Sequence, residues 1–544
     1  MFEADIVLSN NAVFTGLEDK PKPAGIAIKG KRIIAVGSKD EMKDFIGHKT
    51  KVYNLDDQLI MAGFHDAHLH LLLGTLFKDH CVDLSEARSG DEAAMMVKRF
   101  ADERPDEEWV IGIGWDSNNW GNKDFPHRKI LDNLIGDRPL FLIHAEAHYA
   151  WVNTKALEMA NITFETKNPP YGMILKDEDG NPTGILIEAA ISLVGDLAFN
   201  LSKKRQYELL ESFLRYSSSV GVTSVNDLYG GRAYEKLENY DLFKEFDDEG
   251  KLTTRVHIYP AMNGDIERAK QLRDRYNSEK FRVAGLKQFI DGVVTGHTAY
   301  MLDPYADQPD TNGQVAFSPE IIEKWVVEAD KEGFQIRFHA IGDGAVRLGL
   351  NAFEKARKVN GKRDSRHCLE HVEVIHTDDI PRFKELDVIA SIQPSHIAIM
   401  PRDSHTSRTG ENKHPYLYIG NSLKSAGAKL AYSSDFPVAP LNPMVGIYHA
   451  VTRADYHDEP WNKQEQVTLA EALKAYTLGA AYSVFREKEL GTLEEGKLAD
   501  IIVLDRNIFE RPIEELVKTK VQMTLMDGQI VASQLEPEFA GSIK

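Results

Sequence analysis

The chain of 544 residues is too long for one ordinary hydrophobic core, and its hydrophobic content of 42% and charged content of 27% are typical of a soluble multidomain protein. A formal net charge of −19 argues against nucleic acid or an anionic membrane as a partner. Two cysteines, no apolar run long enough to span a bilayer and a start unlike a signal peptide predict a cytoplasmic protein.

Both ends of the chain have the pattern of short β-strands. Near the start, Gly30 lies in a turn between two such strands, and no helical period is seen before about residue 38. The expected strands are 5–8, 26–29, 32–36, 500–504 and 521–531. We therefore predict one small β-sandwich domain that is formed from both chain termini, residues 1–58 and 486–534.

The middle of the chain alternates between strands and amphipathic helices. The expected strands are 222–228, 255–259, 286–290, 335–339, 368–372, 388–393 and 429–433. An earlier strand within residues 59–71 brings the number to eight. Eight β/α units predict an α/β fold, a (β/α)8 TIM barrel, whose remainder occupies residues 201–485 and whose active site lies at the carboxyl ends of the strands.

Residues 72–200 do not continue this alternation. From Trp109 onward they contain several β-like pieces, including a hairpin around the turn at residues 177–181. Because this segment follows the first barrel strand, its loops would overhang the catalytic face. We interpret it as an inserted lid that contributes to specificity.

Candidate metal ligands recur at the ends of the barrel strands. His68 and His70 are two residues apart, so on one strand they would share a face. A single histidine at a strand end is more often structural than a ligand. The later candidates are Lys287 on strand four, His339 on strand five, His371 on strand six and Asp435 at the end of strand eight. Together these six residues predict a site for a divalent cation.

This ordered set, with the motif at residues 62–70, resembles the amidohydrolase superfamily over nearly the whole chain. A later run at 477–481, followed by Gly491, Gly496, Ala499 and Asp500, supports the resemblance. Three segments are similar to the YtcJ-like branch that includes N-substituted formamide deformylase: 148–157, 184–188 and 291–299. The resemblance implies a barrel paired with a β-domain from both chain ends.

The expected reaction is hydrolysis of an amide-type C–N bond in an N-acyl or N-formyl amine. Asp435 can bind a metal with one oxygen and accept the proton of the attacking water with the other, so it is our general base. The metal, expected to be zinc, would lower the pKa of that water towards about 7. The resemblance implies that Lys287 is carboxylated, which would give two metal ions; a lysine paired with Asp291 would leave one.

Several other residues are candidates for the site. His148 can donate to the developing oxyanion or contact the leaving group, or it can be a structural histidine within the insertion. The roles of Glu188 and Asp227 stay open. Trp115, Trp151, His297 and Phe436 are candidate substrate-binding residues, although aromatic side chains more often belong to the core.

Two alternatives remain. A deaminase, or a hydrolase of a lactone, ester or cyclic amide, could use the same barrel, but deaminases of this kind resemble a pattern with glutamate three residues after the histidine of strand five, where this chain has Gly342. A non-catalytic scaffold would need no metal. We expect a small-molecule substrate, and the resemblance suggests a homodimer.

Overall fold

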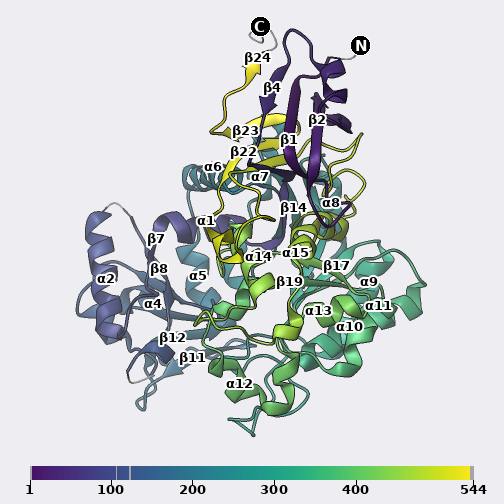
Figure 1. Cartoon of the computed structure of the whole chain (residues 1–544). Helices are drawn as coiled ribbons and strands as arrows, with labels where there is room; N and C mark the ends of the chain where they lie inside the picture. The colour runs from purple at the N-terminus through teal and green to yellow at the C-terminus, as the bar shows by residue number, and fades with distance from the viewer. Residues whose placement is uncertain (1–2, 106, 122–123, 540–544) are drawn as a thin grey trace. The chain divides into compact units, whose positions relative to one another are not determined.

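The computed structural model describes residues 3–105, 107–121 and 124–539, so the first two residues of the predicted terminal β-domain lie outside the described chain. The chain divides into two compact units (Figure 1). The first unit comprises Met1–Leu69, Leu214–Leu228 and Phe243–Lys544, and the second comprises His70–Phe213 and Tyr229–Leu242.

In the first unit, strands from the two chain ends form one nine-stranded sheet. Its order is β23-β22-β21-β5-β1-β2-β3, with β4 beside β1 and β24 beside β4. The strands are β1 (Ile6–Phe14), β2 (Lys22–Lys29), β3 (Arg32–Gly37), β4 (Lys51–Asn54), β5 (Leu59–Ala62), β21 (Ile501–Leu504), β22 (Val521–Met526), β23 (Gln529–Ser533) and β24 (Glu538–Phe539). The predicted β-domain from both termini is confirmed, with purple N-terminal and yellow C-terminal strands together in Figure 1.

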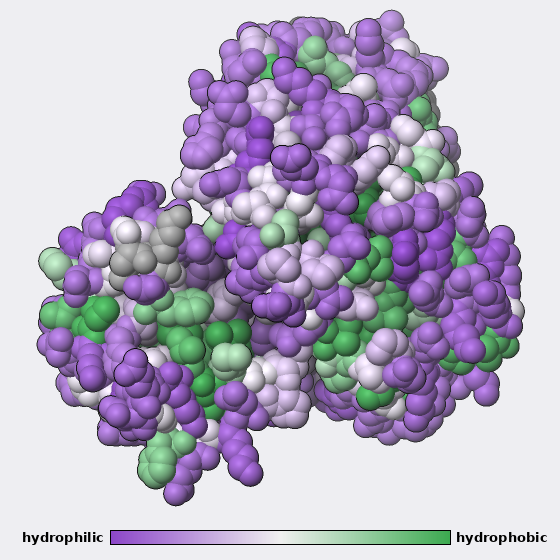
Figure 2. All heavy atoms as spheres, turned by 90° about the horizontal axis from the view of Figure 1, so that it is seen from below, coloured by the Kyte–Doolittle hydropathy of each residue, from purple (hydrophilic) through white to green (hydrophobic). Residues whose placement is uncertain are grey.

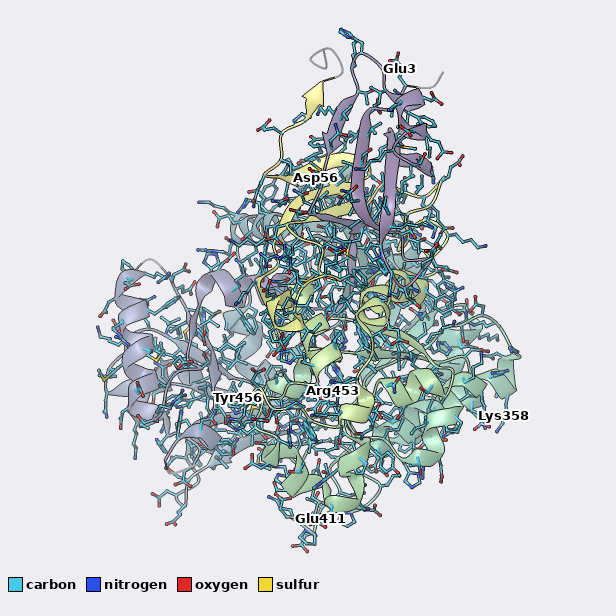
Figure 3. The ribbon with its side chains drawn as sticks, viewed as in Figure 1. Glu3, Asp56, Lys358, Glu411, Arg453 and Tyr456 are labelled. Carbon is cyan, nitrogen blue, oxygen red and sulfur yellow. The ribbon has the colours of Figure 1, made fainter. Side chains whose placement is uncertain are left out.

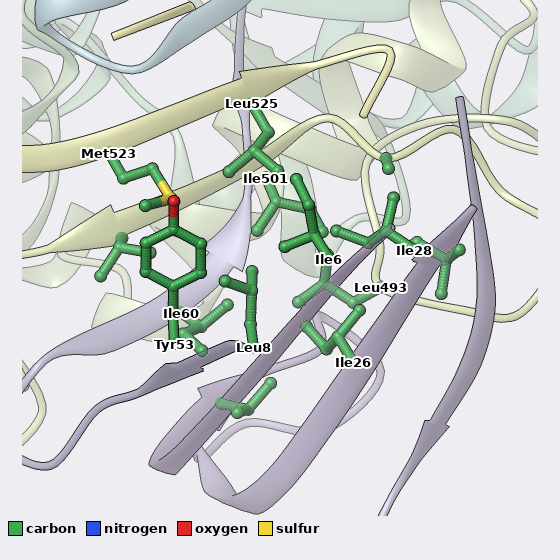
Figure 4. Close-up of a cluster of buried hydrophobic side chains, with 14 of the residues drawn as sticks. Ile6, Leu8, Ile26, Ile28, Tyr53, Ile60, Leu493, Ile501, Met523 and Leu525 are labelled. Atoms are coloured by element: carbon green, nitrogen blue, oxygen red, sulfur yellow. The ribbon is translucent and has the colours of Figure 1, made fainter. Parts of the chain in front are cut away.

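The core of this β-domain is aliphatic. Ile26, Ile60, Ile501 and Leu525 are fully buried and belong to one cluster contributed by strands from both chain ends (Figure 4). Because strands pair in register across β5 and β21, the core positions of the two termini meet on the same side of the sheet. The two chain ends therefore complete a core that neither end forms alone.

The barrel strands also belong to the first unit. They are β6 (Phe64–Leu69), β13 (Val222–Leu228), β14 (Arg255–Tyr259), β16 (Gly285–Phe289), β17 (Gln335–Ala340), β18 (Cys368–His371), β19 (Ile389–Ile392) and β20 (Lys429–Tyr432), and the short β15 (Phe281–Val283) pairs with β14. All neighbouring pairs are parallel. Each predicted strand is present to within about two residues, and residues 59–62 pair with the terminal sheet instead.

Backbone hydrogen bonds link the two barrel sheets into a ring. Lys287 N donates to Pro260 O at 2.9 Å and Met262 N donates to Lys287 O at 2.8 Å, which joins β16 to the end of β14. Asp435 N donates to His68 O at 2.9 Å, which joins the segment after β20 to β6. The predicted (β/α)8 barrel is confirmed.

Helices of the first unit follow the barrel strands in sequence. They are α8 (Ile266–Arg275), α9 (Pro319–Lys331), α10 (Asp343–Asn360), α11 (Ile380–Glu385), α12 (Asp403–Thr409), α13 (Asn421–Ser425), α14 (Pro443–Thr452), α15 (Leu469–Lys474) and α16 (Ala480–Ser483). Two helices cross the sequence boundary between the units, α6 (Lys203–Ser219) and α7 (Tyr240–Asp248). At the outer surface, Lys358 of α10 and Glu411 are exposed (Figure 3).

An ion-pair cluster joins the barrel to the terminal β-domain. Arg255, the first residue of β14, is fully buried and donates two hydrogen bonds of 3.0 Å to Asp500. It also pairs with Asp527. A buried guanidinium needs such partners, because an unpaired charge in the interior is costly.

The second unit contains the insertion. Its six-stranded sheet has the order β11-β12-β10-β9-β8-β7, in which the β7–β8 and β8–β9 pairs are parallel and the later pairs are antiparallel. The strands are β7 (Cys81–Asp83), β8 (Val110–Trp115), β9 (Leu140–His144), β10 (Tyr149–Val152), β11 (Gly172–Lys176) and β12 (Pro182–Glu188). The helices are α1 (Leu71–His80), α2 (Gly90–Glu103), α3 (Arg128–Asp132), α4 (Thr154–Met159) and α5 (Ser192–Ala198).

Hydrophilic residues cover most of the face drawn in Figure 2, with smaller hydrophobic patches between them. Among the described residues, no helix combines the length and the apolar character that crossing a membrane requires.

Candidate metal centre

Three of the predicted ligands meet at the carboxyl end of the barrel. Ligand atoms of His68, His371 and Asp435 all lie within 4.8 Å of one another, and all three side chains are buried. His68 Nε2 is 3.4 Å from Asp435 Oδ1, and His371 Nδ1 is 3.9 Å from Asp435 Oδ2. The residues come from β6, β18 and the segment after β20, strands that are separated in sequence and are brought together by the closed ring.

The backbone at these strand ends is unusual. Asp435, His371 and Val372 have φ values of 58°, 73° and 51°, a left-handed conformation that costs a non-glycine residue energy. Buried Asp66 accepts hydrogen bonds from the backbone N–H groups of His68 at 3.1 Å and Ser434 at 3.1 Å, and thereby ties β6 to the Asp435 segment. The surrounding hydrogen bonds hold the strained strand ends in position.

Each of the two imidazoles has an anchored Nδ1. His68 Nδ1 lies 2.9 Å from Glu370 Oε2, and His371 Nδ1 lies 2.8 Å from Gln393 Oε1. Glu370 in turn accepts a 2.7 Å hydrogen bond from Arg337 Nε. A histidine that donates from Nδ1 to an oxygen presents a lone pair at Nε2, as metal-binding histidines do.

The remaining first-unit candidates lie close to this group. The ring of His339 is 4.5 Å from that of His371, and its Nε2 is 3.0 Å from the carbonyl oxygen of Gly292. Lys287 is fully buried, and its Nζ has no hydrogen-bond partner in the described part of the chain. Burial lowers the pKa of Lys287 to about 8, although Glu370 and Asp435 favour its charged form.

These residues fit a divalent cation. Burial, together with the positive charges of His339 and Lys287, holds the pKa of His371 well below its usual range, so the imidazole is neutral and its lone pair is available. Two ligand atoms of a tetrahedral zinc ion lie about 3.3 Å apart, which matches the 3.4 Å between His68 Nε2 and Asp435 Oδ1. The donor set of imidazole nitrogen and carboxylate oxygen is one that zinc accepts.

His70 does not continue the strand that carries His68. Strand β6 ends at Leu69, and His70 is the N-cap residue of α1, with φ −123° and ψ 89°, in the second unit. The alternation that would give the two imidazoles a common face therefore stops one residue early. A ligand role for His70 stays a prediction.

His148 and Glu188 form a pair within the second unit. His148 directly precedes β10, and its Nδ1 lies 2.9 Å from Oε2 and 3.0 Å from Oε1 of Glu188, the last residue of β12. Glu188 has φ 50° and ψ −126°, and neighbouring Ala147 has φ 62°. Strained residues of this kind often mark functional positions. A catalytic role for His148 stays a prediction.

The predicted substrate-binding residues have different environments. Trp115 and Trp151 are fully buried in the core cluster of the second unit, where Trp115 Nε1 donates to Leu142 O at 2.9 Å. In the first unit, His297 Nε2 lies 3.0 Å from Asp307 Oδ2, and Phe436, 5% exposed, follows Asp435 directly. Asp227 is the penultimate residue of β13. Substrate contact by these residues stays a prediction.

Four residues close to the site have no role predicted from the sequence: Glu370, Arg337, Gln393 and His396. Glu370 directly precedes His371 in β18, a strand in which all four residues are buried. Because a buried charge needs a partner, a carboxylate in such a buried strand indicates a nearby positive or hydrogen-bonding group. His396 follows β19 closely and lies 3.5 Å from Asp435 through Nε2 and Oδ2. Its position just after the seventh barrel strand is comparable to those of the predicted ligands and is the signal that identifies it.

The barrel and its imidazole–carboxylate group define the class of the protein, a metal-dependent hydrolase. Residues 51–532 match the amidohydrolase family, and the chain belongs to this family. It is 32% identical to Protein LONG AFTER FAR-RED 3 of Arabidopsis thaliana, over 97% of this chain and 91% of the relative. It is 30% identical to the putative amidohydrolase YtcJ of Bacillus subtilis, over 95% and 98%.

Two further similarities concern activity and fold. The chain is 28% identical to N-substituted formamide deformylase of Arthrobacter pascens, over 96% of this chain and 97% of the relative. The crystal structure of an uncharacterized metal-dependent hydrolase from Pyrococcus horikoshii matches 94% of this chain and 99% of its own, with 26% identity and a TM-score of 0.75. The predicted family, branch and enzyme class, a metal-dependent amidohydrolase, are confirmed.

Proposed function

We propose that this enzyme hydrolyses a non-peptide amide-type C–N bond in an N-acyl or N-formyl amine. The observation that carries the proposal is the buried group of His68, His371 and Asp435, in which both imidazoles are anchored through Nδ1. Similarity to N-substituted formamide deformylase over 96% of the chain supports an amide substrate.

His68, His371 and Asp435 would hold one cation, and His339 and Lys287 would contribute to a second. A divalent cation such as zinc would supply Lewis acidity and a bound water of lowered pKa. Buried Lys287, with a pKa of about 8, supports carboxylation, because the neutral amine is the form that reacts with carbon dioxide. His70 is retained as a proposed further ligand.

The chain's own residues would carry the proton. Asp435 faces His68 through Oδ1, so Oδ2 is the oxygen that accepts the proton of the attacking water and passes it to the departing nitrogen. His148 is the second proposed catalytic residue. Glu188 fixes its Nδ1 proton, so its Nε2 would serve the oxyanion or the leaving group.

A deaminase is disfavoured by the environment of Gly342. A Cβ atom at this position would lie 2.2 Å from the carbonyl oxygen of Tyr300, so the backbone leaves no room for a glutamate side chain. A non-catalytic scaffold is disfavoured by the anchored imidazoles, because a protein without metal has no need to hold two oriented imidazoles beside one buried carboxylate.

The test is elemental analysis of protein purified without chelator, combined with a hydrolysis screen of N-formyl amines, N-acyl amines, lactones and esters. The wild type should contain one or two metal ions per chain and should hydrolyse an amide of this class. His68→Ala and His371→Ala should lose both metal and activity, whereas His457→Ala, an exposed histidine, should keep both. Folded protein that binds no metal would contradict the proposal.

We also propose that the enzyme acts in the cytoplasm on a small molecule. Cys81 and Cys368 are both buried free thiols, which suits a reducing compartment. A homodimer is the proposed assembly, and light scattering of the purified protein would test it.

A further inference from the structure

His396 is a buried imidazole beside the catalytic carboxylate. It lies in the turn Pro394–Ala398 after β19, is 7% exposed, and has its Nε2 3.5 Å from Asp435 Oδ2. Its ring stacks on that of His371 at 5.6 Å with an interplanar angle of 14°. Among the described residues, its Nε2 has no hydrogen-bond partner.

A hydrogen-bonded network of Glu373, Tyr418 and His405 fixes the tautomer of His396. Its Nδ1 lies 3.3 Å from Glu373 Oε1, and the second oxygen of Glu373 accepts a 3.1 Å hydrogen bond from the hydroxyl of Tyr418. The Tyr418 hydroxyl is in turn 2.7 Å from His405 Nε2. Since Glu373 accepts, Nδ1 of His396 carries the proton, and Nε2 presents a lone pair towards the metal centre.

Two hydrogen-bond acceptors therefore face the same space, Nε2 of His396 and Oδ2 of Asp435. The buried Nε2 of His396 has no hydrogen-bond partner among the described residues and favours a group that brings a donor, since an unmet acceptor is costly in a buried site. His68 Nε2 faces Asp435 Oδ1, and His371 Nδ1 lies 3.9 Å from Oδ2; with Asp435, these two histidines would hold the cation. When the C–N bond breaks, the nitrogen of the amide must lie beside the proton on Asp435 Oδ2. The N–H group of that nitrogen is therefore the substrate donor that fits this position.

We propose that His396 Nε2 and Asp435 Oδ2 bind the N–H of the scissile amide, so that the enzyme selects amides whose nitrogen carries a hydrogen. This inference rests on the proposed function. The C–N bond breaks, water supplies a hydroxyl to the carbonyl carbon and a proton to the nitrogen, and the products are a carboxylic acid and an amine. Secondary amides satisfy the acceptor pair, whereas esters and N,N-disubstituted amides bring no donor to it.

The experiment compares three substrates that share one alkyl group: an N-monosubstituted formamide, its N-methyl derivative and the formate ester. For each substrate, kcat/KM is measured for the wild type, His396→Ala and His396→Gln. Because esters are intrinsically more reactive, the useful quantity is the ratio of variant to wild type for one substrate. Glutamine places an amide oxygen, an acceptor, near the position of Nε2, so it is the conservative rescue variant.

We expect His396→Ala to lower kcat/KM for the monosubstituted formamide by about 10-fold or more, because a hydrogen bond to a charged or buried acceptor pair is lost. The ratio for the donor-free ester should stay within about threefold. His396→Gln should recover part of the loss on the formamide. Metal content should remain that of the wild type in both variants, and His457→Ala should not change any ratio.

An equal loss of kcat/KM on formamide and ester, or a fall in metal content, would show that His396 only supports the metal centre. That result would overturn this inference but not the proposed function. Equal wild-type hydrolysis of the monosubstituted and N-methyl formamides, with no further effect of His396→Ala, would overturn it as well. If metal-loaded wild type hydrolyses none of the three substrates, and no other amide in the screen, the proposed function fails and the inference fails with it.

Discussion

Nδ1 of His68 lies 2.9 Å from Oε2 of Glu370, and neither side chain is exposed to solvent. The other oxygen of Glu370 accepts a 2.7 Å hydrogen bond from fully buried Arg337. One carboxylate therefore orients the imidazole of a proposed metal ligand and compensates a charge inside the barrel. We expect both metal binding and the stability of the barrel to depend on this side chain.

Replacement of Glu370 should separate these two roles. Glu370→Gln keeps the shape but weakens the acceptor, so metal affinity should fall about 10–100-fold in equilibrium dialysis. Glu370→Ala leaves Arg337 without its carboxylate and should lower the free energy of unfolding in urea by about 3–5 kcal/mol. Glu354→Gln, on the surface beside Lys358, should change neither quantity appreciably. Unchanged affinity in Glu370→Gln would contradict the orienting role.

Lys287 should determine the number of bound metal ions. Burial lowers its pKa to about 8, so a large share of the amine is neutral near that pH and can take up carbon dioxide. Lys287→Ala should reduce the metal content from two ions per chain to one, and native mass spectrometry of the wild type should detect the added carboxyl group. Two ions in the variant, or one in wild-type protein prepared with bicarbonate, would make Lys287 a structural residue.

Glu188 should act through His148. Glu188→Gln removes the negative charge that holds the Nδ1 proton at 2.9 Å, so kcat/KM should fall about 10-fold or more. Metal content should not change, because the pair belongs to the second unit and not to the strand-end ligands. The pH profile of kcat/KM should shift in the variant, which loss of a merely structural contact would not produce.

Asp330 should make the barrel sensitive to acid. Although burial opposes ionisation, hydrogen bonds from His367 and Asn360, with the charge of His367 and Arg363, lower the pKa of Asp330 to about 2. Since the unfolded value is about 3.9, the stabilisation is present above about pH 4 and is lost as the pH falls towards 2. Its size should be about 2–3 kcal/mol, because the Asp330 side chain is buried and each pKa unit corresponds to about 1.4 kcal/mol.

Urea unfolding of wild type and Asp330→Asn at several pH values measures this contribution. The wild type should be the more stable protein at pH 6, and the difference should shrink as the pH falls below 4. A difference that does not depend on pH would assign the effect to packing instead of ionisation.

The sequence by itself determined the barrel strands and the order of the candidate ligands. Parallel strands buried on both faces appear as short apolar runs, and catalytic groups occur at their carboxyl ends, so His339, His371 and Asp435 could be placed by local pattern alone. The β-domain from both termini was also predictable, because the terminal segments contain short β-strand patterns and the N-terminal segment has no helical periodicity before about residue 38.

Only the tertiary structure decided which side chains meet. Ring closure brings β6 beside the segment after β20, and left-handed residues at Asp435 and His371 turn these side chains towards His68. The end of β6 at Leu69, the anchoring of His68 by Glu370 and the approach of His396 to Asp435 depend on backbone pairing between segments far apart in the chain. Local periodicity carries no information about such contacts, because they arise from the curvature and register of the closed sheet.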